Sequence, residues 1–345
     1  MRPQRRSGRA VLLGLLSAVG LLAFAGIWPV ASAEAETLTL YSGQHEQTVD
    51  LLVADFEKET GIKVRVHSGE GPEVANQILA EGADSPADVY FTENSPELML
   101  LEEKGLLAKV SAAALASVPG RYNSPGGYWL AVLARESVLA YNPAMIGADQ
   151  LPPSMLDFAD PAWKGKIAIA PSDADFLPAV AAVVALKGKD AALQWLQGLK
   201  RNAQIFDDDE AVVAAVDRGA VATGLINNYY WDRLEIQQGA TATHSKLYHF
   251  GHGDPGAVVN VSGAAVLKSA PYPTAAQRFL VYLVSQRAQE LLAGSKVNFE
   301  YPLRPGVKPD PMLKPFEELQ PPSLDPARLG DDSDVAALLQ EAGLL

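Results

Sequence analysis

The chain has 345 residues, and its 41 acidic residues outnumber its 28 lysines and arginines, which gives a formal net charge of −13. This excess of negative charge argues against nucleic acid as a partner. The absence of cysteine excludes disulfides, thiolate chemistry and the lipid anchor of a bacterial lipoprotein, which requires a cysteine at its cleavage site.

The N-terminus has the three parts of a secretory signal peptide. A basic head with four arginines precedes the apolar run VLLGLLSAVGLLAFAGI, and small residues follow at Ala31 and Ala33. We expect cleavage after Ala33, which removes residues 1–33 and leaves a periplasmic protein without a membrane anchor and with a net charge of −17. The alternative is an uncleaved anchor, because the apolar run approaches the length that spans a bilayer. About 310 residues remain, enough for two domains with separate cores.

The remaining chain alternates segments typical of strands and helices. Its first part predicts strands at 37–41, 62–68 and 87–92 and helices at 46–61, 73–82 and 95–105. A strand at 165–170 then precedes a helix at 172–188, a strand at 222–226 precedes a helix at 227–239, and an extended belt at 302–322 precedes a helix at 334–345. We expect Gly61 as a helix C-cap and Ser95 as a helix N-cap, followed by Pro96. This alternation predicts an α/β fold with mostly parallel sheets.

Signatures of common enzymes are missing from the sequence. It contains no G-x-S-x-G elbow, no Walker A motif and no G-x-G-x-x-G. The fragment SGEGPE at 68–73 lacks the third glycine and the lysine of a phosphate loop, so we expect a plain turn between strand and helix. The fragment HFGHGD at 249–254 has no helix to hold its histidines on one face, so we expect a loop and not a zinc site. We therefore expect a protein that is not an enzyme.

Four polar side chains stand where expected strands turn into helices. His45 follows the first strand, Glu93 follows the third, and Tyr229 and Tyr230 follow the strand at 222–226. Open parallel sheets bind ligands beyond the carboxyl ends of their strands. Singly, His45 could be a turn residue and Glu93 could interact with a helix dipole. Together the four residues supply one imidazole, one carboxylate and two phenols.

The adjacent phenols favour one ion above others. Neighbouring side chains diverge on a strand and on a regular helix, but a turn at a helix start, with Asn228 as its expected N-cap, lets both aim at one point. Ferric iron takes anionic oxygen donors, and tyrosinate is one of its ligands. Zinc and copper rely on histidine and cysteine, whereas calcium and magnesium prefer carboxylates and carbonyls. We expect iron binding to release protons from two phenols and an imidazole.

At this point the sequence resembles a known family, the periplasmic ferric-iron-binding proteins of bacteria, which are the soluble components of iron(III) ABC importers. The resemblance covers nearly the whole chain after residue 33. It rests on YSGQH at 41–45, FEKETGIKV at 56–64, SPADVYFTE at 85–93, LINNYYW at 225–231, DPGAVVNVSGAAVLK at 254–268 and EYPLR at 300–304.

The resemblance implies a ligand set, a fold and partners. The iron(III) ligands of the subgroup that uses histidine and glutamate fall on His45, Glu93, Tyr229 and Tyr230. The family fold is a two-lobed, transferrin-like clamp with two crossovers, expected here near 138–142 and 258–263. Lobe one is then 37–137 plus 264–322, lobe two is 139–262, and residues 323–345 form a C-terminal extension with a short helix. The implied partners are an inner-membrane ABC permease and its ATPase, and we expect a monomer.

The expected anion pocket departs from the family pattern. In many relatives a phosphate or carbonate completes the coordination, held by a helix start with small uncharged residues and by two asparagines. Here that helix start carries Asp173, Ala174 and Asp175, and Asp209 takes the place of one asparagine, while Asn227 is retained. The aspartates either cap the helix or repel anions, since a carboxylate about 5 Å from a phosphate charge costs about 3 kcal/mol. We expect iron to bind without phosphate, with water, a small chelator or an aspartate completing its coordination.

Other functions remain open on the sequence alone. A binding protein of the same fold could carry an organic or oxyanion ligand, such as a polyamine, thiamine or a phosphonate, against the two tyrosines. A hydrolase using Glu93 and an aspartate lacks an evident pair of nucleophile and base. The tyrosine pair could also serve packing only.

Overall fold

The computed structural model describes residues 37–325, 329 and 332–345. The expected signal peptide at 1–33 lies outside these residues. Among the described residues, no helix combines the length and the apolar character needed to cross a membrane.

The strands form one ten-stranded sheet with the order β2-β1-β3-β9-β4-β7-β5-β6, and β8 and β10 pair with β4. Their bounds are β1 Thr37–Gly43, β2 Lys63–Ser68, β3 Val89–Thr92, β4 Trp129–Tyr141, β5 Ile167–Ile169, β6 Ala203–Ile205, β7 Thr223–Asn227, β8 Lys246–Tyr248, β9 Val259–Val266 and β10 Tyr301–Pro302.

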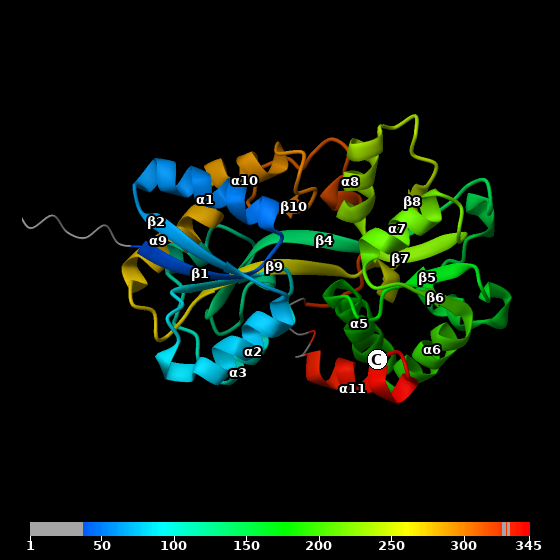
Figure 1. The fold of residues 1–345 in the computed structure, drawn as a ribbon, viewed down its shortest axis with the longest axis horizontal. Helices are drawn as coiled ribbons and strands as arrows, with labels where there is room; N and C mark the ends of the chain where they lie inside the picture. The colour runs from blue at the N-terminus through cyan, green and yellow to red at the C-terminus, as the bar shows by residue number, and fades with distance from the viewer. Residues whose placement is uncertain (1–36, 326–328, 330–331) are drawn as a thin grey trace, which may run out of the picture. The chain divides into compact units, whose positions relative to one another are not determined.

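Helices connect and cover these strands (Figure 1). Their bounds are α1 Glu46–Thr60, α2 Gly71–Glu81, α3 Ser95–Glu103, α4 Ala112–Leu115, α5 Leu177–Lys187, α6 Lys189–Asn202, α7 Asp209–Asp217, α8 Asn228–Gln238, α9 Pro273–Leu283, α10 Gln286–Ala293 and α11 Asp332–Ala342. The short 3₁₀ helix η6, Ala174–Phe176, leads directly into α5.

The prediction of mostly parallel sheets is wrong for the middle of the sheet. β1 pairs in parallel with β2 and β3, and β5 pairs in parallel with β6 and β7. β4, however, is antiparallel to β7, β8, β9 and β10, and β3 is antiparallel to β9. Parallel neighbours need a crossover connection, usually a helix, so the strand–helix periodicity of the sequence identifies the parallel pairs among the outer strands. It does not identify the antiparallel pairs in the middle.

The long strand β4 changes partners along its length. It pairs with β9 over residues 129–136 and with β7 over residues 137–141. In Figure 1, β1, β2, α1 and α9 lie on one side of this change and β5, β6 and α6 lie on the other, with β4 and β9 running between them. Both strands thus belong to the connection between the two groups of elements.

Two clusters of buried side chains form the core. The first gathers around β1, β3, β9, α1 and α9 and continues along β4 to α7 and the start of α8, where it includes Tyr229 and Tyr230. The second gathers around β5, α5, α6 and α11. Because the tyrosines belong to a packed core, their rings are fixed from one side by apolar neighbours.

Two predicted helix caps are displaced by one residue. α3 begins at Ser95 with Asn94 as its N-cap, and α8 begins at Asn228 with Asn227 as its N-cap. Neither asparagine side chain caps its helix. The Asn94 side chain accepts a hydrogen bond from Arg135 instead. The side chain of Asn228, the predicted cap of α8, accepts a hydrogen bond from the backbone of Glu136 in β4. The predicted C-cap Gly61 is confirmed, with a left-handed φ of 74° that favours glycine.

One close approach of backbone places the first candidate ligand. A Cβ at Gly43, the last residue of β1, would lie 2.5 Å from the Cα of Gly71 at the start of α2. Only glycine allows this contact between strand and helix. It fixes the turn in which His45 follows as the N-cap of α1.

The C-terminal helix α11 packs against α5 and α6. Val335, Leu338 and Leu339 of α11 belong to the second core cluster. α11 thereby supports α5, and the segment that leads into α5 contains Asp173 and Asp175.

Leu339→Ala is therefore expected to lower the free energy of unfolding by about 2–5 kcal/mol, because Leu339 is fully buried and its removal leaves a cavity. The matched control is Gln340→Ala on the exposed face of the same helix, with an expected change within about 0.5 kcal/mol. Urea denaturation followed by circular dichroism measures both. Equal stabilities of the two variants would show that α11 does not contribute to the core.

Candidate metal centre

The four predicted ligand residues lie within a few ångströms of one another. The Nδ1 atom of His45 lies 3.1 Å from Oε1 of Glu93. The ring centroid of His45 lies 5.1 Å from that of Tyr229 and 6.2 Å from that of Tyr230. The sequence prediction that these side chains meet is therefore matched by the geometry of the described residues.

The sheet explains why His45 and Glu93 meet. β1 and β3 are parallel neighbours, with Gly43 opposite Thr92 at their carboxyl ends. The residues that follow these two ends therefore emerge at the same edge of the sheet. His45 leads into α1 and Glu93 leads into α3.

The start of α8 brings the two phenols to one point. Tyr229 and Tyr230 lie in its first turn, with ring centroids 4.3 Å apart and ring planes inclined by 34°. Both hydroxyls donate to the same oxygen, Oδ2 of Asp175, and the Tyr230 contact measures 3.1 Å. The tyrosines are only 1% and 7% exposed. A buried carboxylate thus aims both phenols at one place.

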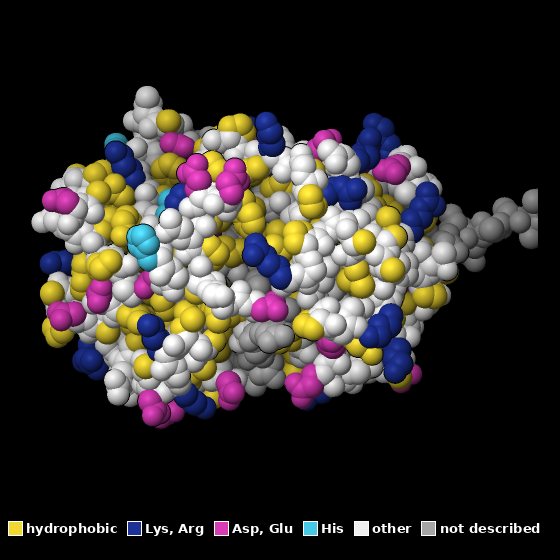
Figure 2. All heavy atoms as spheres, turned by 180° about the vertical axis from the view of Figure 1, so that it is seen from behind, with side chains coloured by type: hydrophobic (Ala, Val, Ile, Leu, Met, Phe, Trp, Pro, Cys, Tyr) yellow, Lys and Arg dark blue, Asp and Glu magenta, His cyan; other side chains and the backbone are white. Residues whose placement is uncertain are grey.

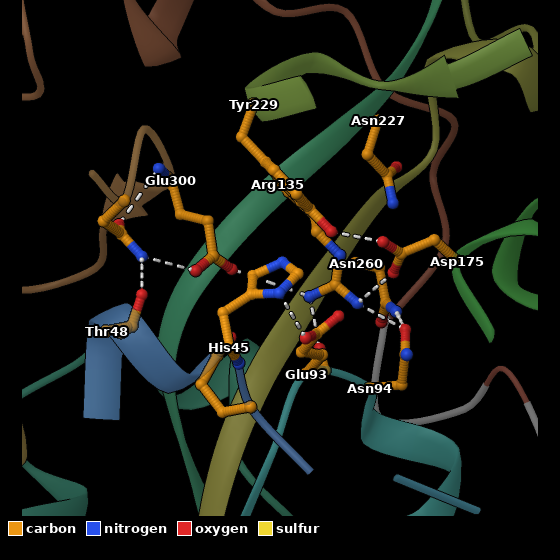
Figure 3. Close-up of polar contacts among 12 residues, drawn as sticks. His45, Thr48, Glu93, Asn94, Arg135, Asp175, Asn227, Tyr229, Asn260 and Glu300 are labelled. Carbon is orange, nitrogen blue, oxygen red and sulfur yellow. Dashed lines mark hydrogen bonds and ion pairs between the residues drawn. The ribbon is translucent and has the colours of Figure 1, made fainter. Parts of the chain in front are cut away.

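Arg135 of β4 joins the parts of the centre (Figure 3). Its guanidinium is fully buried and donates to the backbone oxygen of Glu93, to the side chain of Asn94 and, at 3.0 Å, to Oδ1 of Asp175. Oε1 of Glu300 lies 3.7 Å from Nη1 of Arg135. Arg135 therefore connects the turn after β3 with the segment before α5.

Burial and negative charge oppose ionisation of the phenols. Burial, and next the Asp175 carboxylate, raise the pKa of Tyr229 and of Tyr230 well above the usual value. Burial also opposes ionisation of Asp175, but the Arg135 guanidinium and the hydrogen bond from Tyr229 hold its pKa below the ordinary range. The phenols thus keep their protons unless a strong cation approaches.

The imidazole of His45 is already prepared to act as a ligand. Burial, and next the positive charge of Arg233, lower the pKa of His45 to about 3. Its Nε2 atom is buried and has no hydrogen-bond partner. The expectation that metal binding removes a proton from this imidazole is therefore wrong, because the ring is neutral at neutral pH. Burial raises the pKa of Glu93 well above its usual value, so the carboxyl of Glu93 can supply a proton in its place.

The residues of the predicted anion pocket have separate positions. Asp173 is the N-cap of η6 and accepts hydrogen bonds from the backbone of Asp175 and of Asp209, both at 3.0 Å. Asp209 accepts from the backbone of Asn227 at 3.1 Å. Ala174 and Asp173 line the cleft in front of the phenols. The Asp173 side chain thus caps a helix, whereas the Asp175 side chain accepts hydrogen bonds from the two tyrosines.

Sequence reasoning missed the buried groups that support the centre. Arg135 was not singled out, nor were Asn94, Asn260 and Glu300, although Asn260 donates to Asn94 at 2.7 Å. A signal was present, because Arg135 and Glu136 are two adjacent charged residues in the mostly apolar strand WLAVLARESVLAY. Charged residues in a fully buried strand need partners and so mark a site.

The centre opens into a cleft of about 790 Å³. His45, Glu93, Asp173 and Tyr230 are in its wall. Within the described residues, no group of three or more His, Cys, Asp or Glu side chains is placed to hold a metal ion.

Comparisons with known proteins agree with this architecture. The family model of the bacterial extracellular solute-binding proteins matches residues 52–320. The Fe(3+)-binding periplasmic protein of Serratia marcescens is 40% identical over 96% of this chain and 97% of its own length. Iron-bound HitA of Pseudomonas aeruginosa is 44% identical, with a TM-score of 0.86 over 89% of this chain and 99% of that one. Trichodesmium FutA with iron and citrate is 32% identical, with a TM-score of 0.77 over 89% and 99% of the two chains. The fold is thus that of two-lobed periplasmic binding proteins, and the chain belongs to the family of bacterial extracellular solute-binding proteins.

Proposed function

We propose that this protein captures ferric iron and delivers it to an ABC permease and its ATPase in the inner membrane. The observation that carries the proposal is the convergence of two buried phenols, Tyr229 and Tyr230, with the imidazole of His45 and the carboxylate of Glu93. In this proposal the four side chains are the iron ligands, and the protein binds and transports without catalysing a reaction.

The electrostatics of the centre support a highly charged metal ion. Both phenols are held protonated by burial and by Asp175, so a ligand that uses their oxygens must displace two protons. Iron(III) polarises phenols strongly enough to do so, whereas calcium and magnesium favour carboxylates. The two phenol oxygens lie around one carboxylate oxygen, an arrangement that suits an ion better than an extended organic molecule such as a polyamine or thiamine.

The relatives support the same substrate. The similar proteins of Serratia and Pseudomonas are described as Fe(3+)-binding and iron-bound. We propose the same cargo for this chain and a periplasmic location after removal of residues 1–33. The proposed lobes are 37–137 plus 264–322 and 139–262, with 323–345 as an extension. Iron favours the closed arrangement of the two lobes because it binds the closed form more tightly than the open form.

Asp175 is our candidate for completing the coordination of iron. Four protein ligands leave two positions of an octahedral ion open. Oδ2 of Asp175 already contacts both phenols, so it lies where an added anion would have to bind. A phosphate there would meet the carboxylates of Asp175 and Asp173, each costing about 3 kcal/mol at 5 Å and an effective dielectric of 20. We therefore propose iron binding without phosphate.

The first prediction concerns the phenols. Tyr229→Phe and Tyr230→Phe should each remove most of the iron affinity and the visible tyrosinate band, because each deletes an anionic oxygen donor. His45→Ala and Glu93→Ala should weaken binding less, since water replaces the lost ligand. Titration of the apoprotein with a ferric chelate, read by visible absorbance, measures the effect. Tyr248→Phe, outside the centre, serves as the control, and a Tyr230→Phe protein with the wild-type band would refute the assignment.

The second prediction concerns pH. Iron displaces two phenol protons, and a proton on Glu93 adds to them where that carboxyl is protonated, so acid should weaken binding by at least about 100-fold per pH unit. The loaded protein should lose its colour between neutral pH and about pH 4. His45 stays neutral over this range because its pKa is about 3. The His45→Ala protein should therefore lose its colour with the same steepness, although at higher pH. A colour that persists unchanged down to about pH 4 would count against tyrosinate ligands.

The third prediction concerns the added anion. Millimolar phosphate should leave the visible band of the iron-loaded protein in place. Asp175→Asn removes the carboxylate that lies 3.0 Å from the Arg135 guanidinium, so phosphate should then shift the band. Asp208→Asn, which keeps a capping side chain at the start of α7, is the matched control and should behave like the wild type. A shift of the wild-type band with phosphate would overturn the prediction.

A further inference from the structure

The mouth of the cleft is acidic on both sides. Among the described residues, eight carboxylate side chains line the cleft, and no lysine or arginine does. Six of these eight belong to exposed residues, three at the starts of α1 and α2 and three at the start of α7. These six mouth carboxylates are Glu46, Glu70, Glu73, Asp207, Asp208 and Glu210.

The mouth carboxylates are not neutralised by neighbours. Among the residues that the structure describes, none of the six forms an ion pair with a lysine or arginine. The face of the molecule in Figure 2 carries lysine and arginine side chains among the acidic ones. The chain as a whole has 28 basic residues beside its 41 acidic ones, so the net charge alone does not account for a cleft without a basic side chain.

A second feature of the cleft points to a ligand that carries oxygen. Gln44 is only 4% exposed and lies in the cleft wall beside His45. Its Oε1 accepts from the backbone of His45 at 2.8 Å, whereas its Nε2 is buried without a partner. A buried donor of this kind requires an acceptor. Water or hydroxide carried by a metal ion would supply one.

We propose that the mouth carboxylates select the chemical form in which iron enters the cleft. Cationic hydroxo-aqua iron(III) and neutral iron complexes enter, whereas anionic chelates such as ferric citrate are repelled. This inference rests on the proposed function of the centre.

The rate of entry is the quantity that such a mouth controls. Clefts lined by one sign of charge change association rates of charged ligands about 10- to 1000-fold, and salt reduces the effect. The six carboxylates are exposed whereas both phenols are buried, so an incoming species meets the carboxylates first. Repulsion should therefore appear in uptake kinetics and weaken as salt is added.

The test compares two iron donors and two charge variants. The cleft variant combines Glu70→Gln, Glu73→Gln, Asp207→Asn and Glu210→Gln, whose side chains form no hydrogen bond or ion pair with any residue that the structure describes. The control variant removes four exposed acids outside the cleft through Asp190→Asn, Glu317→Gln, Glu318→Gln and Glu341→Gln. Each apoprotein is mixed with ferric citrate or with the neutral tris(acetohydroxamate) complex of iron(III). Tryptophan fluorescence follows uptake at low and high potassium chloride.

We expect the cleft variant to take iron from ferric citrate about tenfold faster than the wild type at low salt. Added salt should accelerate the wild type toward the variant, and the control variant should match the wild type. Uptake from the neutral complex should agree within about twofold in all three proteins, because no net charge is repelled. Equal rates from ferric citrate in the cleft and control variants would overturn the inference while leaving the iron site intact. Failure of the wild type to take iron from either donor would overturn the proposed function and this inference together.

Discussion

The centre depends on the buried ion pair between Arg135 and Asp175. The guanidinium holds the carboxylate in its ionised form, and the carboxylate accepts from both phenols, so one interaction orients Tyr229 and Tyr230. The same guanidinium binds the backbone oxygen of Glu93. Removal of one partner from a buried ion pair costs about 3–5 kcal/mol, because the other charge is left without compensation. The pair therefore sets the geometry of groups that come from distant parts of the chain.

The charges around this pair explain how the centre can exchange protons for a metal. One guanidinium faces Asp175, Glu93 and Glu300, and burial raises the pKa of the last two. As long as no metal is present, the two phenol hydroxyls donate hydrogen bonds to the Asp175 carboxylate and stabilise its negative charge. In the proposed function, iron(III) displaces these protons, and the negative charges of the resulting phenolate oxygens compensate the charge of the ion. The neutral imidazole of His45 adds a donor without a proton to lose.

The sequence predicted the parts of this arrangement that depend on periodicity and on strand ends. Residues His45 and Glu93 meet because β1 and β3 are parallel neighbours, and strand–helix alternation is sufficient to indicate this. The antiparallel middle of the sheet was not predictable in the same way, because the pairing of β4 with β9 joins segments more than a hundred residues apart. The direction of the Asp175 side chain was also left open, since it depends on Arg135 of β4, which is 40 residues away in the sequence. Local pattern identifies a capping aspartate but does not distinguish Asp173, which caps, from Asp175, which contacts the phenols.

The most direct test of the account is a crystal structure of the iron-loaded protein with anomalous diffraction data collected at the iron absorption edge. The account predicts a single strong anomalous peak within bonding distance of both phenol oxygens, with the hydrogen bonds from Tyr229 and Tyr230 to Asp175 replaced by bonds to the metal. A peak elsewhere in the molecule, or phenols that still donate to Asp175 beside a bound iron, would contradict the central claim.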